Sequence, residues 1–128
     1  MPIVGEMQAM DREPLQVEYL WWAECPSHEA GSALLEQALA AEGVVPQIRS
    51  IEIVDDDAAL RYAFPGSPTI RLNGRDIDPV PEPTGAARPF ALTCRAYRRE
   101  DGRIAPLPTL AQLRAAIHRA YDGRSTLD

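Results

Sequence analysis

The stretch Tyr19-Leu-Trp-Trp-Ala-Glu-Cys25-Pro26-Ser27-His28 joins an apolar run to an amphipathic one, with a cysteine at the junction. Residues 16–22 are rich in β-branched and aromatic side chains and are apolar on both sides near the end, which predicts a central parallel strand. Downstream, a helix is expected to run to about Glu42, with Pro26 in its first turn, where no N–H is needed. The apolar stripe of this helix comprises Ala30, Leu34, Leu35, Ala38 and Leu39.

A cysteine at the start of a helix has a distinctive electrostatic environment. It lies at the positive end of the helix dipole, among backbone N–H groups that have no partner within the helix. Both features favour the thiolate, which is the reactive form of cysteine. We therefore predict that Cys25 is a reactive thiol, and the alternative is a small, buried apolar residue.

The elements that follow are marked by local signals. Gly43 is expected to end the helix, and residues 47–54 read as a second strand. The acids of residues 55–57 are interpreted as the cap of a helix over 58–64 rather than as a metal site, because no matching ligand cluster occurs elsewhere. Beyond the break at residues 65–68, Asn73-Gly74 predicts a hairpin of strands 69–72 and 75–77.

The remaining chain is expected to hold a proline-rich loop over 79–89, a strand over 93–98 and a last helix. Thr109 and Gln112 have the spacing of a capping box at the start of that helix, and Gly123 is expected to end it. A β-α-β crossover makes its strands parallel and the hairpin adds antiparallel ones. We therefore expect a mixed sheet of four to five strands with helices on both faces.

In this interpretation, residues 1–14 form a loose N-terminal arm. Residues 15–123 form one domain with a proline-rich insertion at 79–92, and residues 124–128 form a tail.

Composition restricts the class of protein. The 128 residues carry a net charge of −6, and apolar residues make up 45%, as in a soluble globular domain. The acidic balance argues against nucleic acid and anionic membranes as partners. With no apolar run long enough for a bilayer and no secretory signal, we expect a cytoplasmic protein. In that reducing compartment, Cys25 and Cys94 are expected to be free, catalytic or transiently paired. Oligomeric state leaves no signal in the sequence.

The element order and four short motifs resemble the thioredoxin/glutaredoxin-like superfamily, with its three-layer α/β/α fold. The motifs are Cys25-Pro-Ser-His28, Gly66-Ser-Pro-Thr69, Asn73-Gly-Arg-Asp76 and Cys94-Arg-Ala-Tyr97. Together they are most similar to small bacterial thioredoxin-fold proteins of poorly defined function, some of which are labelled alkylmercury-lyase-like. The resemblance implies that Pro68 is a cis-proline that approaches Cys25.

The resemblance also suggests a candidate site. His28 stands where a dithiol oxidoreductase carries its second cysteine, so Cys25 would act as a monothiol or accept Cys94 as its resolving thiol. His28 lies three residues on and could stabilise the thiolate or accept the thiol proton. Ser67 and Pro68 would pair with an extended substrate, and Trp22 is a candidate floor of the cleft.

Three functions remain open at this stage. The first is a thiol–disulfide oxidoreductase acting on protein disulfides or small thiol adducts without a cofactor, with Cys25, His28 and Cys94 in the catalytic roles. The second is a redox-inactive binding module on the same fold. The third is the handling of a soft metal or an organomercurial by Cys25 and Cys94, because thiolates suit such ions.

Overall fold

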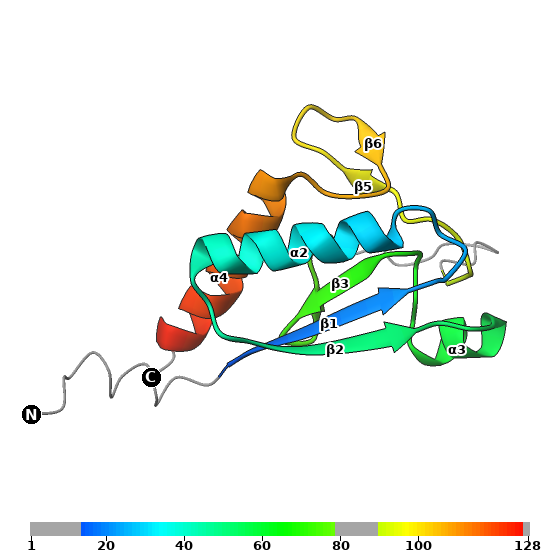
Figure 1. Ribbon diagram of the computed structural model, residues 1–128, viewed down its shortest axis with the longest axis horizontal. Coiled ribbons are helices and arrows are strands. Elements are labelled where there is room, and N and C mark those ends of the chain that lie inside the picture. The colour runs from blue at the N-terminus through cyan, green and yellow to red at the C-terminus, as the bar shows by residue number, and fades with distance from the viewer. Residues whose placement is uncertain (1–13, 79–89, 127–128) are drawn as a thin grey trace, which may run out of the picture.

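The computed structural model describes residues 14–78 and 90–126, which form a mixed α/β unit (Figure 1). In chain order the elements are β1 (Leu15–Trp21), α2 (His28–Glu42), β2 (Pro46–Glu52), α3 (Asp56–Arg61), β3 (Thr69–Leu72), β4 (Arg75–Asp76), β5 (Tyr97–Arg98), β6 (Ile104–Ala105) and α4 (Leu110–Thr126). The predicted arm and most of the proline-rich insertion lie outside the described residues. Among the helices of the described part, none is long and apolar enough to cross a membrane.

The main sheet has four strands in the order β2-β1-β3-β4. β1 is parallel to β2 and antiparallel to β3, and β4 returns antiparallel to β3. The parallel pair follows from the crossover through α2, and the antiparallel β3–β4 pair follows from the turn at Asn73 and Gly74, which both have positive φ. The predicted mixed sheet, with its first strand in a central position, is confirmed.

One face of this sheet is covered by helices, whereas the other is covered only near the carboxyl ends of β1 and β2, so the expectation of helices on both faces holds only in part. α2 and α4 contact each other and cover one face, whereas the short α3 lies at the carboxyl ends of β1 and β2 (Figure 1). The larger core comprises Leu15, Val17, Tyr19, Leu35, Ala38, Leu39, Ile70, Leu72, Leu113, Ala116 and Ile117. The smaller core, under α3, comprises Leu20, Ile51, Ile53, Ala58, Ala59 and Phe64. Alternation along β1 sends neighbouring side chains to different cores.

The predicted helix caps are present. Gly43 ends α2 in the left-handed conformation at φ 65°. The Asp55 carboxylate accepts a hydrogen bond from the backbone N–H of Ala58 at 2.8 Å, which confirms the predicted cap. Thr109 and Gln112 exchange hydrogen bonds of 3.0 and 3.1 Å, as a capping box requires.

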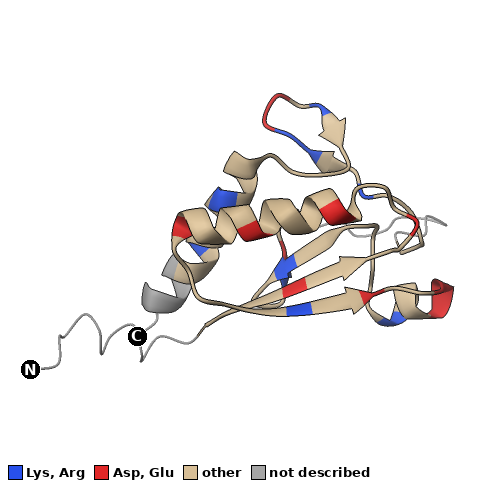
Figure 2. Cartoon of the chain, in the orientation of Figure 1, with Lys and Arg blue, Asp and Glu red and all other residues tan. Residues whose placement is uncertain are grey.

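Charged side chains join the two long helices. α2 carries acidic side chains but no Lys or Arg (Figure 2). Glu42 at its end contacts Arg114 and His118 of α4. The Arg114 guanidinium lies 2.8 Å from a Glu42 oxygen, and the imidazole of the exposed His118 lies 3.4 Å from the other. His118 is therefore a surface residue.

The start of α2 differs from the prediction. The helix begins at His28 rather than at Pro26, because Ser27 is its N-cap. Its buried stripe includes Gly31, while Ala30 is exposed. An added Cβ at Gly31 would lie 2.4 Å from the Tyr19 hydroxyl, so the close approach of α2 to the sheet requires a residue without a side chain.

Two predictions in the last third of the chain are wrong. Residues 93–98 do not form one strand of the main sheet, because Cys94 makes only an isolated bridge to Ser67 and β5 pairs with β6 in a separate ribbon. α4 also continues through Gly123 to Thr126. A single glycine inside a helix costs only about 1 kcal/mol, which does not by itself terminate the helix.

Candidate functional site

Cys25 lies in the turn between β1 and α2. Its backbone N–H donates to the Trp22 carbonyl at 3.0 Å, and its side chain is 1% exposed. The thiol donates to the Ser67 carbonyl oxygen at 3.5 Å. Cys25 precedes the Ser27 cap by two residues, so the expectation that it opens the helix among unpaired N–H groups is wrong.

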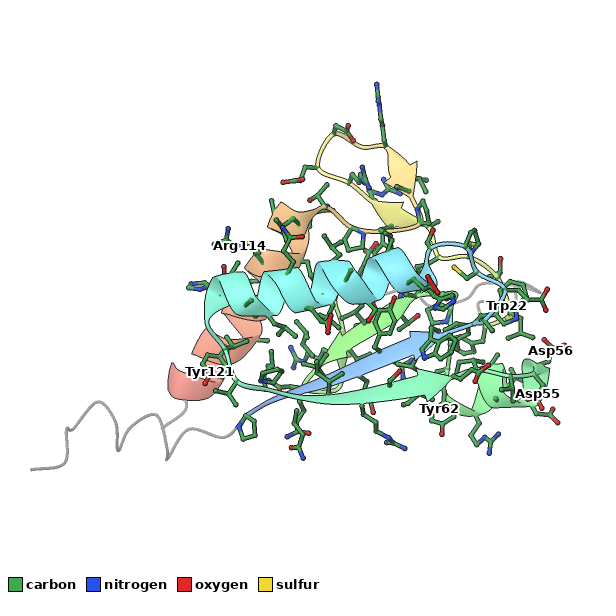
Figure 3. All side chains as sticks on the ribbon, in the orientation of Figure 1. Trp22, Asp55, Asp56, Tyr62, Arg114 and Tyr121 are labelled. Carbon is green, nitrogen blue, oxygen red and sulfur yellow. The ribbon has the colours of Figure 1, made fainter. Side chains whose placement is uncertain are left out.

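The corner at Ser67 and Pro68 contacts this turn. The Ser67–Pro68 peptide bond is cis. The Ser67 hydroxyl accepts a hydrogen bond of 3.0 Å from the backbone N–H of Trp22. Trp22 is half-buried at the carboxyl end of β1, on the side where α3 lies (Figure 3). A substrate-binding role for Ser67, Pro68 and Trp22 stays a prediction.

The backbone of Ser67 is occupied by the chain's own segment 93–95. Its N–H donates to the Thr93 carbonyl at 2.7 Å, and its carbonyl accepts from the Arg95 N–H at 2.8 Å. The expectation that Ser67 presents free backbone groups to an extended substrate is therefore wrong. A strand-like peptide would have to displace this segment in order to pair there.

The same pairing brings the two cysteines together. Cys94, between the two hydrogen-bonded residues, directs its thiol to Cys25, with 3.9 Å between the sulfurs. Both cysteines are free thiols, Cys25 buried and Cys94 exposed. Residues separated by 69 positions thus form one dithiol at a corner of the fold.

Arg95 anchors the segment that carries Cys94. Its buried guanidinium donates to both carboxylate oxygens of Asp76, at 2.9 and 3.0 Å, and to the Thr69 hydroxyl at 3.2 Å. It also donates to the Asp78 carbonyl and lies 4.8 Å from the Tyr97 ring centroid. This bidentate pairing fixes the orientation of the side chain.

Tyr97 attaches the far end of the segment to the corner. Its hydroxyl donates to the Pro68 carbonyl at 2.6 Å. Burial raises the pKa of this hydroxyl, so it remains a donor throughout the neutral range. Sequence reasoning quoted the motif containing Arg95 and Tyr97 but assigned neither residue a role. The sequence signal that could have indicated the buried ion pair is Arg95, next to Cys94, together with the acids Asp76 and Asp78 after the predicted hairpin turn.

His28 does not contact the sulfurs. Its ring stacks on Trp21 with centroids 4.7 Å apart, and its backbone carbonyl accepts from the Tyr19 hydroxyl. Within the described residues, the imidazole makes no hydrogen bond to either cysteine. The assignment of His28 as a proton-transfer partner stays a prediction, and this stacking does not favour it.

A metal ion bound at the dithiol would have Cys25 and Cys94 as its two sulfur ligands. Within residues 14–78 and 90–126, no group of three or more His, Cys, Asp or Glu side chains is placed to hold a metal ion.

The environment raises the pKa of Cys94. Partial loss of hydration at the protein surface contributes most, and the hydrogen bond and negative charge of Cys25 add to it. A raised pKa lowers the thiolate fraction at any pH below it, so the thiol reacts more slowly near neutrality than a free cysteine would.

We expect alkylation of Cys94 by iodoacetamide to accelerate with pH through a midpoint above that of free cysteine. In Cys25→Ala the midpoint should fall, because the hydrogen bond and the charge of Cys25 are both removed. The rate at Cys94 would be followed by peptide mapping, with a cysteine-containing peptide as the reference. Equal midpoints for the protein and the peptide would contradict this account.

Comparisons of the chain with protein-family models, with curated proteins and with solved structures give no match.

Proposed function

We propose that the protein is a thiol–disulfide redox protein in which Cys25 and Cys94 cycle between two thiols and one intramolecular disulfide. The observation that carries the proposal is the 3.9 Å separation of the two sulfurs. The S–S bond of a disulfide is about 2.05 Å long. Rotation of the two side chains can bring the sulfurs to that distance when the two backbone segments are close. Ser67 joins the two segments, because its backbone hydrogen-bonds to the residues on both sides of Cys94 while its hydroxyl and carbonyl accept from the Trp22 N–H and the Cys25 thiol.

A thioredoxin-like relationship is part of the proposal. It is supported by the mixed sheet order, by α2 and α4 packed together on one face and by the hydrogen bond of the Cys25 thiol to Ser67 beside Pro68. The pairing differs from that of a dithiol motif within one helix turn, because the second thiol comes from the segment after β4. Because Cys94 supplies the second thiol, the proposed function does not require a cysteine at the position of His28.

The occupied corner favours small substrates. An extended peptide finds the Ser67 N–H and carbonyl already bonded to Thr93 and Arg95, so it would gain no strand pairing beside the dithiol. A low-molecular-weight disulfide needs only access to an exposed sulfur, which Cys94 provides. We therefore propose small disulfides and thiol adducts as the substrate class in preference to protein disulfides. The same occupied backbone disfavours a redox-inactive module that would bind a peptide by pairing with Ser67.

The proposal is tested by equilibrating the protein in buffers of graded dithiol-to-disulfide ratio, with a chelator present, and then counting free thiols. We expect a single two-electron transition from two thiols to none, independent of protein concentration. Cys25→Ser and Cys94→Ser should each lack this transition and keep one thiol or one mixed disulfide. Two free thiols at every ratio, or a disulfide that forms only between molecules, would refute the function.

A further inference from the structure

On the basis of the proposed function, we infer that Cys94 is the thiol that attacks the substrate and that Cys25 is the resolving thiol. This order is the reverse of the one suggested by the position of Cys25 before the first helix. Solvent exposure carries the inference, because Cys94 is exposed whereas Cys25 is 1% exposed. A substrate sulfur must reach the attacking thiolate directly, and the surface thiol meets that condition without any opening of the fold.

The two thiols differ in what holds them. The Cys25 thiol donates to the Ser67 carbonyl and is buried, whereas the exposed Cys94 thiol is bonded to Cys25. The buried thiol is thus held against the backbone, and the exposed thiol is the one that solvent reaches. The two sulfurs are 3.9 Å apart. Cys25 therefore lies within reach of the Cys94 sulfur when Cys94 carries part of the substrate in a mixed disulfide.

The reaction balances in two exchange steps. The Cys94 thiolate attacks one sulfur of a small disulfide, which forms a mixed disulfide at Cys94 and releases the first small thiol. The Cys25 thiolate then attacks the Cys94 sulfur, which forms the Cys25–Cys94 bond and releases the second small thiol. The substrate gains two electrons and the dithiol loses two, while the two protein thiol protons leave with the products. An external thiol reductant would reverse the protein's oxidation.

Arg95 is a positioning residue in this scheme. Its buried pairing with Asp76 and its backbone bond to Ser67 hold the neighbouring Cys94 above Cys25. It touches neither sulfur in the described contacts, so its effect on the reaction is through the placement of Cys94.

The order of attack is tested with an aromatic disulfide, whose released thiol is coloured, on the reduced protein. We expect Cys25→Ser to react at least as fast as the first step of the wild type, because the loss of Cys25 lowers the pKa of Cys94, and to retain a mixed disulfide at Cys94. Cys94→Ser should react at least about tenfold more slowly, because the buried Cys25 reacts only after local opening. Faster reaction of Cys94→Ser than of Cys25→Ser would overturn the inference.

A measurement on the wild type removes any dependence on how well the variants fold. With iodoacetamide at less than one equivalent, peptide mapping should find the first label on Cys94. First labelling of Cys25 would overturn the order of attack and leave the dithiol function standing. Failure of the wild type to form the intramolecular disulfide would instead remove the proposed function, so the two failures are distinguishable.

Discussion

Replacing Arg95 with methionine is expected to lower the free energy of unfolding by about 3–5 kcal/mol. The side chain is 3% exposed and donates to Asp76, Thr69 and Asp78. Methionine has a similar volume but no donors, so the substitution leaves the Asp76 carboxylate largely buried without its cation. The cost arises mainly from that uncompensated charge rather than from lost packing. Urea-induced unfolding of the two proteins measures the difference.

Two further variants identify the cause of this loss. Arg75→Met changes an exposed arginine on the hairpin that carries Asp76 and should cost less than about 0.5 kcal/mol. Adding Asp76→Asn to Arg95→Met should recover part of the stability, because it removes the unpaired charge. The interpretation fails if Arg95→Met costs no more than Arg75→Met, or if the two substitutions at the buried pair are additive.

Replacing Gly31 with alanine is expected to destabilise the protein by about 1–3 kcal/mol, because of overpacking. Alanine alone would favour the helix by about 1 kcal/mol. Its Cβ, however, would lie 2.4 Å from the Tyr19 hydroxyl and 3.0 Å from atoms of Leu107 and Pro68. These neighbours belong to three different segments, so we expect the clash to outweigh the gain in helix propensity. Thermal and urea unfolding both measure the change.

The Tyr19 hydroxyl provides the matched test of that clash. In a Tyr19→Phe background the closest contact disappears, so Gly31→Ala should cost clearly less there than in the wild type. Ser32→Ala, at the next and exposed position of α2, serves as the control and should be neutral or slightly stabilising. An equal cost of Gly31→Ala in the two backgrounds would show that the tyrosine is not the obstacle.

Features decided within a few residues could be predicted from the sequence. The Asp55 cap, the reciprocal Thr109 and Gln112 bonds and the turn at Asn73-Gly74 depend on side chains or φ values inside one turn. The mixed sheet followed because the crossover and the hairpin fix which strands are parallel. The mixed α/β class could therefore be predicted from local turn and cap residues and from the handedness of the crossover connection.

Features decided by distant contacts could not be predicted. The pairing of Ser67 with the segment around Cys94 joins residues far apart in sequence. No local signal indicates this pairing, so the sequence predicts an ordinary strand over residues 93–98. Gly31 is buried against Tyr19 and Pro68, which come from distant parts of the chain. Arg95 is buried where the Asp76 carboxylate, on the hairpin, pairs with it. The position of Cys25 before the cap was missed because Pro26 is equally compatible with a turn.

The central claim is that Cys25 and Cys94 act as one dithiol. The most direct measurement is the amount of small thiol released when the fully reduced protein is mixed with an excess of a small aromatic disulfide and no other reductant. We predict two equivalents per wild-type molecule, released in sequence with no adduct left on the protein, and one equivalent with a stable adduct for Cys25→Ser. A wild type that releases two equivalents but retains two adducts, or releases one equivalent alone, would contradict the account.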